Sequence, residues 1–255
     1  MKFSLALLLS FGALGQPTPT PTPHELLTKA KHLGLDPKTV DQVQPLLEQA
    51  AQAWPNVDPR SLEYAQTLTL LGIVKQAQSD LDINVMRTDV EPLYKRALAV
   101  YNRSLVPADP LELALPLELE AAALATIGQV EESELLKERA LAIRKEHIRE
   151  MQQGEKAIPA AYQAGEGISA PVTLSRTEPA YTDVARFLRI EGKVIFRVIV
   201  DEQGVPRDIA LIDDLGYGLD ENALDAVRAW RFKPGMSGGA PVPVIAKLQV
   251  DFHLP

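Results

Sequence analysis

The sequence predicts an α+β protein of two domains: an all-α region built from helical hairpins, followed by a small α/β domain with a three-stranded antiparallel sheet. Two observations carry this prediction. Residues 24–156 are rich in Ala, Leu, Glu, Gln and Lys and poor in glycine, as helices are. Residues 171–255 contain runs in which apolar and polar residues alternate, as strands do. Residues 157–170, with five Ala, two Gly and one Pro, break the helical pattern and are expected to be the linker. The 255 residues suffice for a core in each domain.

Residues 1–15 have the layout of a secretory signal peptide. Lys2 precedes an uncharged apolar run at residues 3–14, and the small residues Ala13 and Gly15 flank Leu14 before a plausible cleavage at Gln16. A membrane-spanning helix needs about 20 apolar residues, so we expect a cleaved signal and an exported protein. An uncleaved anchor in the inner membrane is the alternative.

Residues 16–23 are expected to be a short tether. Residues 17–23 read PTPTPTP, and alternating proline favours polyproline II at about 3.1 Å per residue, which gives a reach of ~22 Å.

The helical region is self-similar. Residues 90–100 (VEPLYKRALAV) match residues 133–143 (SELLKERALAI), and residues 43–50 (VQPLLEQA) resemble the same helix. Asp-Pro pairs at Asp58 and Asp109 are expected to open the intervening helices, since proline is tolerated in a first turn. Two helices per repeat of 40-odd residues predict a solenoid of helical hairpins. An irregular helical bundle is the simpler alternative.

The segments EPLYKRALAV and ESELLKERALAIR resemble tetratricopeptide repeats of the long-helix variety found in kinesin light chain. The resemblance covers about 120 residues of region 24–156. Two departures from the repeat pattern are extra residues near 78–89 and Pro116, which falls where a helix should continue.

The last domain is expected to follow the order α-β-β-α-β. A short helix is expected at residues 181–188, strands at 192–201, 205–212 and 242–252, and an amphipathic helix at 219–230 capped by Asp220. The turn at residues 201–204 has Gly204 available for a positive φ. Helices would then cover one face of the sheet, and its outer strands would leave two open edges.

Several segments of this domain resemble the C-terminal domain of the TonB family. They are EPAY at residues 178–181, EGKV at 191–194, VDEQG at 200–204, GYGLDENALDAVRAWRFKP at 216–234 and VPVIAKLQVDF at 242–252. The resemblance covers about 80 residues, and the block ending in WRFKP is its most specific part. It implies a bacterial protein of the periplasm that contacts other proteins during transport across the envelope.

Composition and motifs argue against an enzyme, a metal protein or a nucleic-acid binder. The chain has no cysteine, its four histidines are scattered, and no nucleotide-binding or hydrolase motif occurs. We therefore expect no catalytic residue, cofactor or metal. Acidic residues number 34 against 26 basic ones, a formal charge of −8, which disfavours phosphate contacts.

The last strand is the candidate site for a partner. In the TonB family it receives a short extended peptide of an outer-membrane transporter, and an exposed strand edge is a template for strand addition. The residues carried over are Val244, Ile245, Ala246, Lys247, Leu248, Gln249 and Val250. Lys247 and Asp251 can equally be charges that block the edge against aggregation.

Two functions remain open at this stage. The first is a periplasmic adaptor, in which the helical repeats bind one protein and the TonB-like domain binds another, such as a TonB-dependent transporter. The alternative is energy transduction from an inner-membrane motor complex to outer-membrane transport. A homodimer formed through the same edge is a further alternative.

Overall fold

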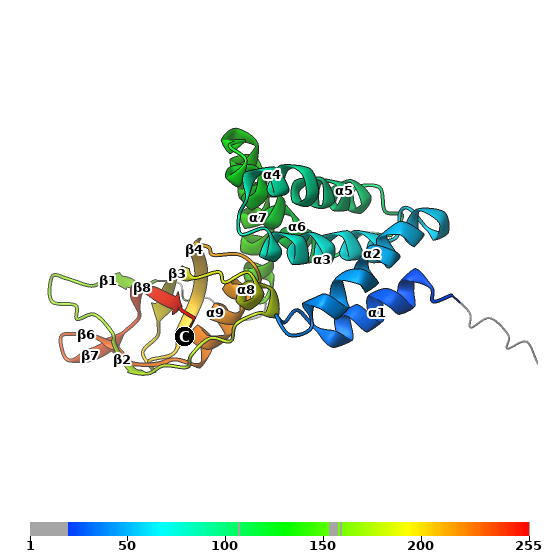
Figure 1. Ribbon diagram of the computed structural model, residues 1–255. Coiled ribbons are helices and arrows are strands. Elements are labelled where there is room, and N and C mark those ends of the chain that lie inside the picture. The colour runs from blue at the N-terminus through cyan, green and yellow to red at the C-terminus, as the bar shows by residue number, and fades with distance from the viewer. Residues whose placement is uncertain (1–19, 107, 153–157, 159, 255) are drawn as a thin grey trace, which may run out of the picture.

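The computed structural model describes residues 20–106, 108–152, 158 and 160–254. A helical region comes first and a small domain with a sheet follows, as Figure 1 shows. The predicted signal peptide at residues 1–15 and the first part of the predicted tether lie outside the described residues.

The helices of the first region run from residue 23 to residue 150. They are α1 (Pro23–Leu33), α2 (Val40–Val57), α3 (Leu62–Gln78), the short α4 (Ile83–Val85), the π-helical segment η1 (Met86–Val90), α5 (Glu91–Tyr101), α6 (Pro110–Thr126) and α7 (Val130–Glu150).

Helix starts follow local capping chemistry. Asp109 caps α6 by accepting a hydrogen bond from the backbone N–H of Leu111 at 2.9 Å, with Pro110 in the first turn as predicted. The predicted start at Asp58-Pro59 is wrong, because α3 begins at Leu62 and Ser61 caps it. Pro116 lies inside α6, which continues through it.

Successive helices pack against one another. The closest pairs are α1 with α2, α3 with α5, and α6 with α7, and buried side chains from them form several apolar clusters. The similar segments of the sequence fall on α2, α5 and α7. The assignment to tetratricopeptide repeats stays a prediction.

No helix among the described residues has the length and apolar character needed to cross a membrane.

In the described part of the chain after α7, the second domain has two helices and eight strands. Its elements are β1 (Tyr162–Gln163), β2 (Val172–Ser175), α8 (Asp183–Phe187), β3 (Gly192–Val200), β4 (Pro206–Asp213), α9 (Leu219–Ala229), β5 (Arg231–Lys233), β6 (Gly235–Ser237), β7 (Ala240–Val242) and β8 (Val244–Phe252). Helix α9 packs on β3 and β4, and alternate residues of β3 form the core beneath it.

The prediction of a three-stranded sheet is wrong by one strand. The main sheet has four strands in the order β1-β8-β3-β4, in which β8, β3 and β4 are antiparallel and β1 runs parallel to β8. The additional strand is Tyr162–Gln163, which lies within the segment expected to be a linker. Two residues without a clear alternating pattern give no strand signal in the sequence. The boundaries of the two domains stay a prediction.

Asp220 does not cap α9 as expected. The helix begins at Leu219, and Gly218 is its N-cap residue with a φ of 78°. The fully buried Asp220 carboxylate instead accepts hydrogen bonds from the backbone N–H groups of Leu215 and Gly216. It therefore holds the loop that precedes the helix.

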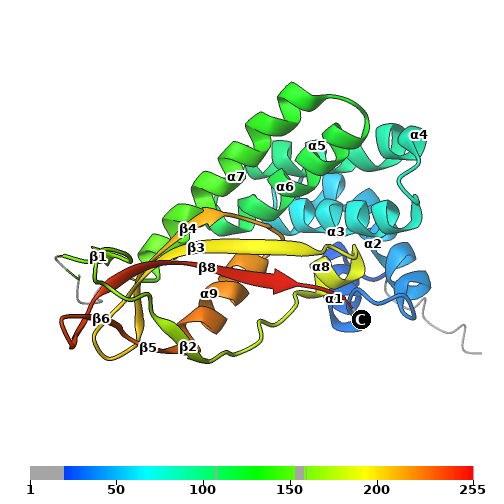
Figure 2. The ribbon, with the colours of Figure 1, turned by 90° about the vertical axis from the view of Figure 1, so that its left-hand side faces the viewer.

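The helical region and the sheet domain share apolar contacts. Leu141, Ile148 and Met151, from α7 and the turn after it, pack against the core of the sheet. Conversely, Phe187 of α8 and Tyr217, which belong to the sheet domain, pack against buried residues of the helical region. Figure 2 shows α7 descending toward β4 and α8 lying against the helices. The two regions are therefore joined through packed side chains.

Candidate partner-binding edge

Strand β8 has a partner along only part of its outer side. Its inner side pairs with β3 from Val244 to Phe252, and β1 pairs with its outer side at Val244 and Ile245 alone. Beyond Ile245, no strand in the described part of the chain pairs with the outer side. The edge is therefore covered at its first two residues and uncovered along residues 246–252.

One hydrogen bond identifies which residues of β8 direct their backbone N–H and C=O groups toward the outer side of the strand. The N–H of Tyr162 in β1 donates to the carbonyl of Pro243 at 2.9 Å, so residue 243 directs its backbone polar groups away from β3. These groups alternate between the two sides along a strand, and the pairing of β3 with β8 has no register shift. Lys247, Gln249 and Asp251 therefore present their N–H and C=O groups on the uncovered edge.

The opposite edge of the sheet is capped by a side chain at one residue, Ile209. The amide of Gln152, just after α7, accepts from the backbone N–H of Ile209 at 2.7 Å and donates to its carbonyl at 2.6 Å. The side chain thereby occupies the outer groups of Ile209, in the middle of β4, as one residue of a paired strand would. A strand added along β4 would have to displace this amide, whereas β8 is uncovered along residues 246–252.

A groove of about 560 Å³ runs beside the uncovered part of β8. Thr173 of β2 and Arg176 line it opposite the edge, and Trp230 and Phe232 line its apolar part. The Arg176 guanidinium lies 4.9 Å from the centre of the Trp230 ring, and the Trp230 Nε1–H donates to the carbonyl of Thr177 at 2.9 Å. These contacts hold the far wall in place.

The side chains of β8 alternate between the core and solvent. Leu248 and Val250 are buried in the core of the sheet, whereas Lys247, Gln249 and Asp251 are exposed. The Gln249 amide donates to the Asp251 carboxylate at 2.7 Å. An extended chain that enters the groove would meet unpaired backbone groups on one side and the Trp230 region below, which is the geometry for binding a peptide backbone.

Two of the residues predicted to bind a partner, Val244 and Ile245, are paired with β1. The others lie on the uncovered part of β8, and all but Val250 line the groove; they are Ala246, Lys247, Leu248, Gln249 and Val250. Sequence reasoning missed Gln152, and it missed the wall formed by Arg176 and Trp230. No local pattern marks Gln152, because its partner Ile209 is 57 residues away.

A buried charge cluster joins the two regions and lies apart from the groove. Arg144 of α7 binds Glu118 of α6 and Glu221 of α9, and Asp220 lies 3.5 Å from it. Burial raises the pKa of Glu118, and burial raises the pKa of Asp220 to about 7. One guanidinium is shared among the three carboxylates, and each carboxylate has its partner within the protein, so the cluster has the form of a structural connection.

The described residues contain no group of three or more His, Asp or Glu side chains placed to hold a metal ion.

The comparison with protein families follows the same elements. Residues 177–254 match the family model of the Gram-negative bacterial TonB protein C-terminal. The TonB-like segment thus includes β3, β4, α9 and β8, while β1, β2 and Gln152 lie before it. The helical region also lies outside the match.

Two curated relatives each match about a third of the chain. The chain is 32% identical over 89 residues to Protein TonB of Vibrio cholerae serotype O1, covering 34% of this chain and 36% of the relative. It is 33% identical over 82 residues to Protein TonB of Escherichia coli K12, covering 31% of this chain and 34% of the relative. The chain thus spans about a third of the length of these TonB proteins.

Proposed function

We propose that this protein is a non-enzymatic interaction protein of the bacterial periplasm, which binds an extended segment of another protein along the outer edge of β8. The partner class is a protein of envelope transport, such as an outer-membrane transporter. The support for transport is the match of residues 177–254 to the TonB C-terminal family model.

The observation that carries the proposal is the difference between the two sheet edges. Gln152 saturates the outer groups of Ile209 in β4, whereas the outer groups of Lys247, Gln249 and Asp251 have no strand partner in the described chain. Backbone hydrogen bonds to such an edge supply affinity with little dependence on sequence, and the groove beside it supplies selectivity. The edge is also long enough to pair with an extended segment of several residues, since residues 246–252 span about 23 Å at ~3.3 Å per residue.

The test is a titration of the full-length protein, labelled with ¹⁵N, with synthetic peptides from the periplasm-facing segments of candidate transporters. We expect the amide signals of Lys247, Gln249 and Asp251 to shift most, because their N–H groups would gain carbonyl partners. Amide signals of β4 should stay in place. Shifts confined to the helical region, or no shift with any peptide, would contradict the proposal.

A backbone-modified peptide provides the matched control. Methylation of the peptide nitrogens that face β8 removes donors without changing the side chains, so binding by strand addition should weaken at least tenfold, as expected from the loss of several hydrogen bonds. Methylation of the alternate nitrogens should have a much smaller effect. Equal effects of the two peptides would indicate recognition through side chains alone.

Energy transduction is the second candidate, favoured by the similarity to two proteins named Protein TonB. In this role the chain would couple an inner-membrane motor complex to outer-membrane transport. The two roles differ in the fate of residues 1–15. Mass spectrometry of the native protein from membrane and periplasmic fractions distinguishes them: a retained segment in the inner membrane supports transduction, and cleavage before Gln16 supports the adaptor.

A further alternative occupant of the edge is a second copy of this chain. Pairing of two β8 strands would make a homodimer through the same residues that bind the partner. Sedimentation of the protein with and without peptide distinguishes these uses, because a peptide that takes the edge would dissociate such a dimer.

A further inference from the structure

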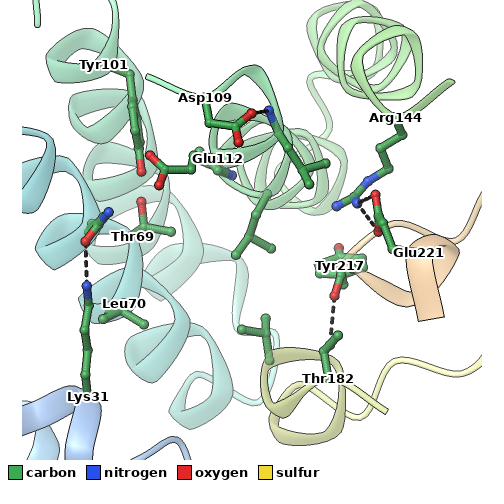
Figure 3. Close-up of a pocket in the computed structure, with 16 residues that line it drawn as sticks. Lys31, Thr69, Leu70, Tyr101, Asp109, Glu112, Arg144, Thr182, Tyr217 and Glu221 are labelled. Atoms are coloured by element: carbon green, nitrogen blue, oxygen red, sulfur yellow. Dashed lines mark hydrogen bonds and ion pairs between the residues drawn. The ribbon is translucent and has the colours of Figure 1, made fainter. Parts of the chain in front are cut away.

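A cleft of about 540 Å³ lies between the helical region and the sheet domain (Figure 3). Helices α1, α3, α5, α6 and α7 contribute to its lining from the helical region. Thr182, Val184, Tyr217, Gly218 and Glu221 line it from the sheet domain. Its volume is in the range of sites that enclose a small molecule.

The body of the cleft is apolar. Leu70 of α3 and Leu115 and Pro116 of α6 line it, together with Val184 and the ring of Tyr217. A second hollow of about 210 Å³ shares Leu70, Val184 and Lys31 with it and continues between α1, α2 and α8. The apolar space is therefore elongated, and it suits a chain-like ligand.

The charges around the cleft differ in whether they have partners. Arg144 is bound by Glu118 and Glu221, so it offers no free donor edge toward an anion. Lys31 donates to the side chain of Gln66 at 2.6 Å. No described residue donates a hydrogen bond or forms an ion pair with the carboxylate of Glu112, which leaves it available to a ligand.

Glu112 lies beside an aromatic ring. Figure 3 shows it next to Tyr101 of α5, on the side of the cleft opposite Tyr217. Burial, and after it the charge of Glu112, raises the pKa of the Tyr101 hydroxyl. A carboxylate beside a phenol hydroxyl, at the end of an apolar space, is an arrangement that can recognise an organic cation with an apolar chain.

We propose that the cleft between α3, α6 and α8 binds a cationic amphiphile, with the apolar chain between Leu70, Leu115 and Val184 and the positive group at Glu112 and Tyr101. The excess of carboxylates favours this sign: Asp109, Glu112 and Glu221 line the cleft against Lys31 and Arg144. Because both regions line the cleft, the ligand stabilises their packed arrangement. This site is separate from the β8 edge, so its test is independent of the proposed function.

Calorimetric titration of the full-length protein with decyltrimethylammonium, below its micellar concentration, tests the proposal. Decyl sulfate and decanol share the chain and differ in charge, so they serve as comparison probes. We expect one-to-one binding of the cation, about tenfold weaker binding of decanol and weaker binding still of decyl sulfate. Methyl NMR signals of Leu70, Leu115 and Val184 should shift together.

Glu112→Gln is the decisive variant. The residue is exposed, so the fold should be retained, and circular dichroism checks this. We expect the cation to bind about tenfold more weakly to this variant, and decanol to bind as before. Glu138→Gln, on the exposed face of α7, removes the same charge away from the cleft and should leave the affinity unchanged.

Three results would overturn the proposal. Equal affinity for the cation and the sulfate would show that only the apolar chain is recognised. An equal loss of affinity in the Glu112→Gln and Glu138→Gln variants would show that the probe responds to the net charge of the protein. Failure to bind any of the three probes would also overturn it, without bearing on peptide binding at β8.

Discussion

Arg144 in α7 donates from Nη1 to both carboxylate oxygens of Glu221 in α9, at 2.7 Å each. The rest of the guanidinium binds both oxygens of Glu118 in α6, and one of these also accepts the backbone N–H of Tyr217 at 2.7 Å. One buried cation therefore connects two helices of the helical region to the sheet domain. Such fork geometry needs arginine, because lysine offers only a point charge.

Replacing this cation should destabilise the whole protein. In Arg144→Met, the buried carboxylates of Glu118 and Asp220 lose their counter-ion, and breaking one partner of a buried ion pair costs about 3–5 kcal/mol. The loss should be smaller at pH 5 than at pH 8, because the unpaired carboxylates take up protons there. Urea unfolding at the two pH values measures both effects.

Arg149→Met is the matched control for this prediction. Arg149 binds Glu146 on the exposed face of the same helix, where solvent screens an ion pair and leaves it little effect on stability. If the two variants lose the same free energy of unfolding, the cluster around Arg144 does not hold the two regions together.

Glu120 should make the protein less stable as the pH rises. Burial, with help from Glu91 and Glu132 and opposed by Lys95, raises the pKa of this carboxyl from 4.5 to about 7. The folded state therefore retains a proton that the unfolded chain releases, and the stability that this proton supplies is lost as the pH rises from about 4.5 through 7. Between pH 5 and pH 8, the free energy of unfolding of Glu120→Gln should therefore fall by roughly 1–2 kcal/mol less than that of the unchanged protein.

The check is chemical unfolding of the two proteins at a series of pH values. Glu138→Gln should keep the pH profile of the unchanged protein, since its side chain is exposed. Parallel profiles for Glu120→Gln and the unchanged protein would refute the role assigned to Glu120.

Gly204 allows the turn between β3 and β4 to approach β5. Its φ is +76°, and a Cβ there would lie 1.8 Å from the carbonyl oxygen of Phe232. The backbone carbonyl of Gly204 also accepts from the Phe232 N–H at 2.9 Å. Gly204→Ala should therefore cost more than about 3 kcal/mol of unfolding free energy, whereas Gly238→Ala, at φ +55° with open space, should cost about 1 kcal/mol. Thermal unfolding compares the two, and similar melting temperatures would contradict this reading of the turn.

The sequence predicted those elements whose signal is local. Strand β3 and helix α9 follow from alternation and from helical spacing, and the start of α6 follows from Asp109-Pro110. Strand β1 was missed because Tyr162 and Gln163 gain their conformation from β8 rather than from their own pattern. Asp220 was misplaced because its partners are backbone groups of a loop that no pattern describes.

Only part of the candidate site could be predicted, because only part of it has a local signal in the sequence. The alternation of β8 and its resemblance to a known family indicated the strand, but the state of its edge depends on distant residues. Whether an edge is open is decided by what packs beside it, which here are β1 on β8 and Gln152 on β4. The cleft at Glu112 is likewise formed by helices from both regions and has no sequence signature.

Gln152 should keep the β4 edge from pairing with other chains. Gln152→Ala removes both hydrogen bonds to the backbone of Ile209, which should cost about 1–3 kcal/mol and leave an unpaired edge beside the exposed Ile212. In sedimentation experiments we expect this variant to associate through the β4 edge as its concentration rises. The unchanged protein should not associate through that edge. Gln52→Ala, on an exposed part of α2, controls for loss of a glutamine and should neither associate nor lose stability. If Gln152→Ala remains as monodisperse as this control, the edge is protected by α7 itself and not by the amide.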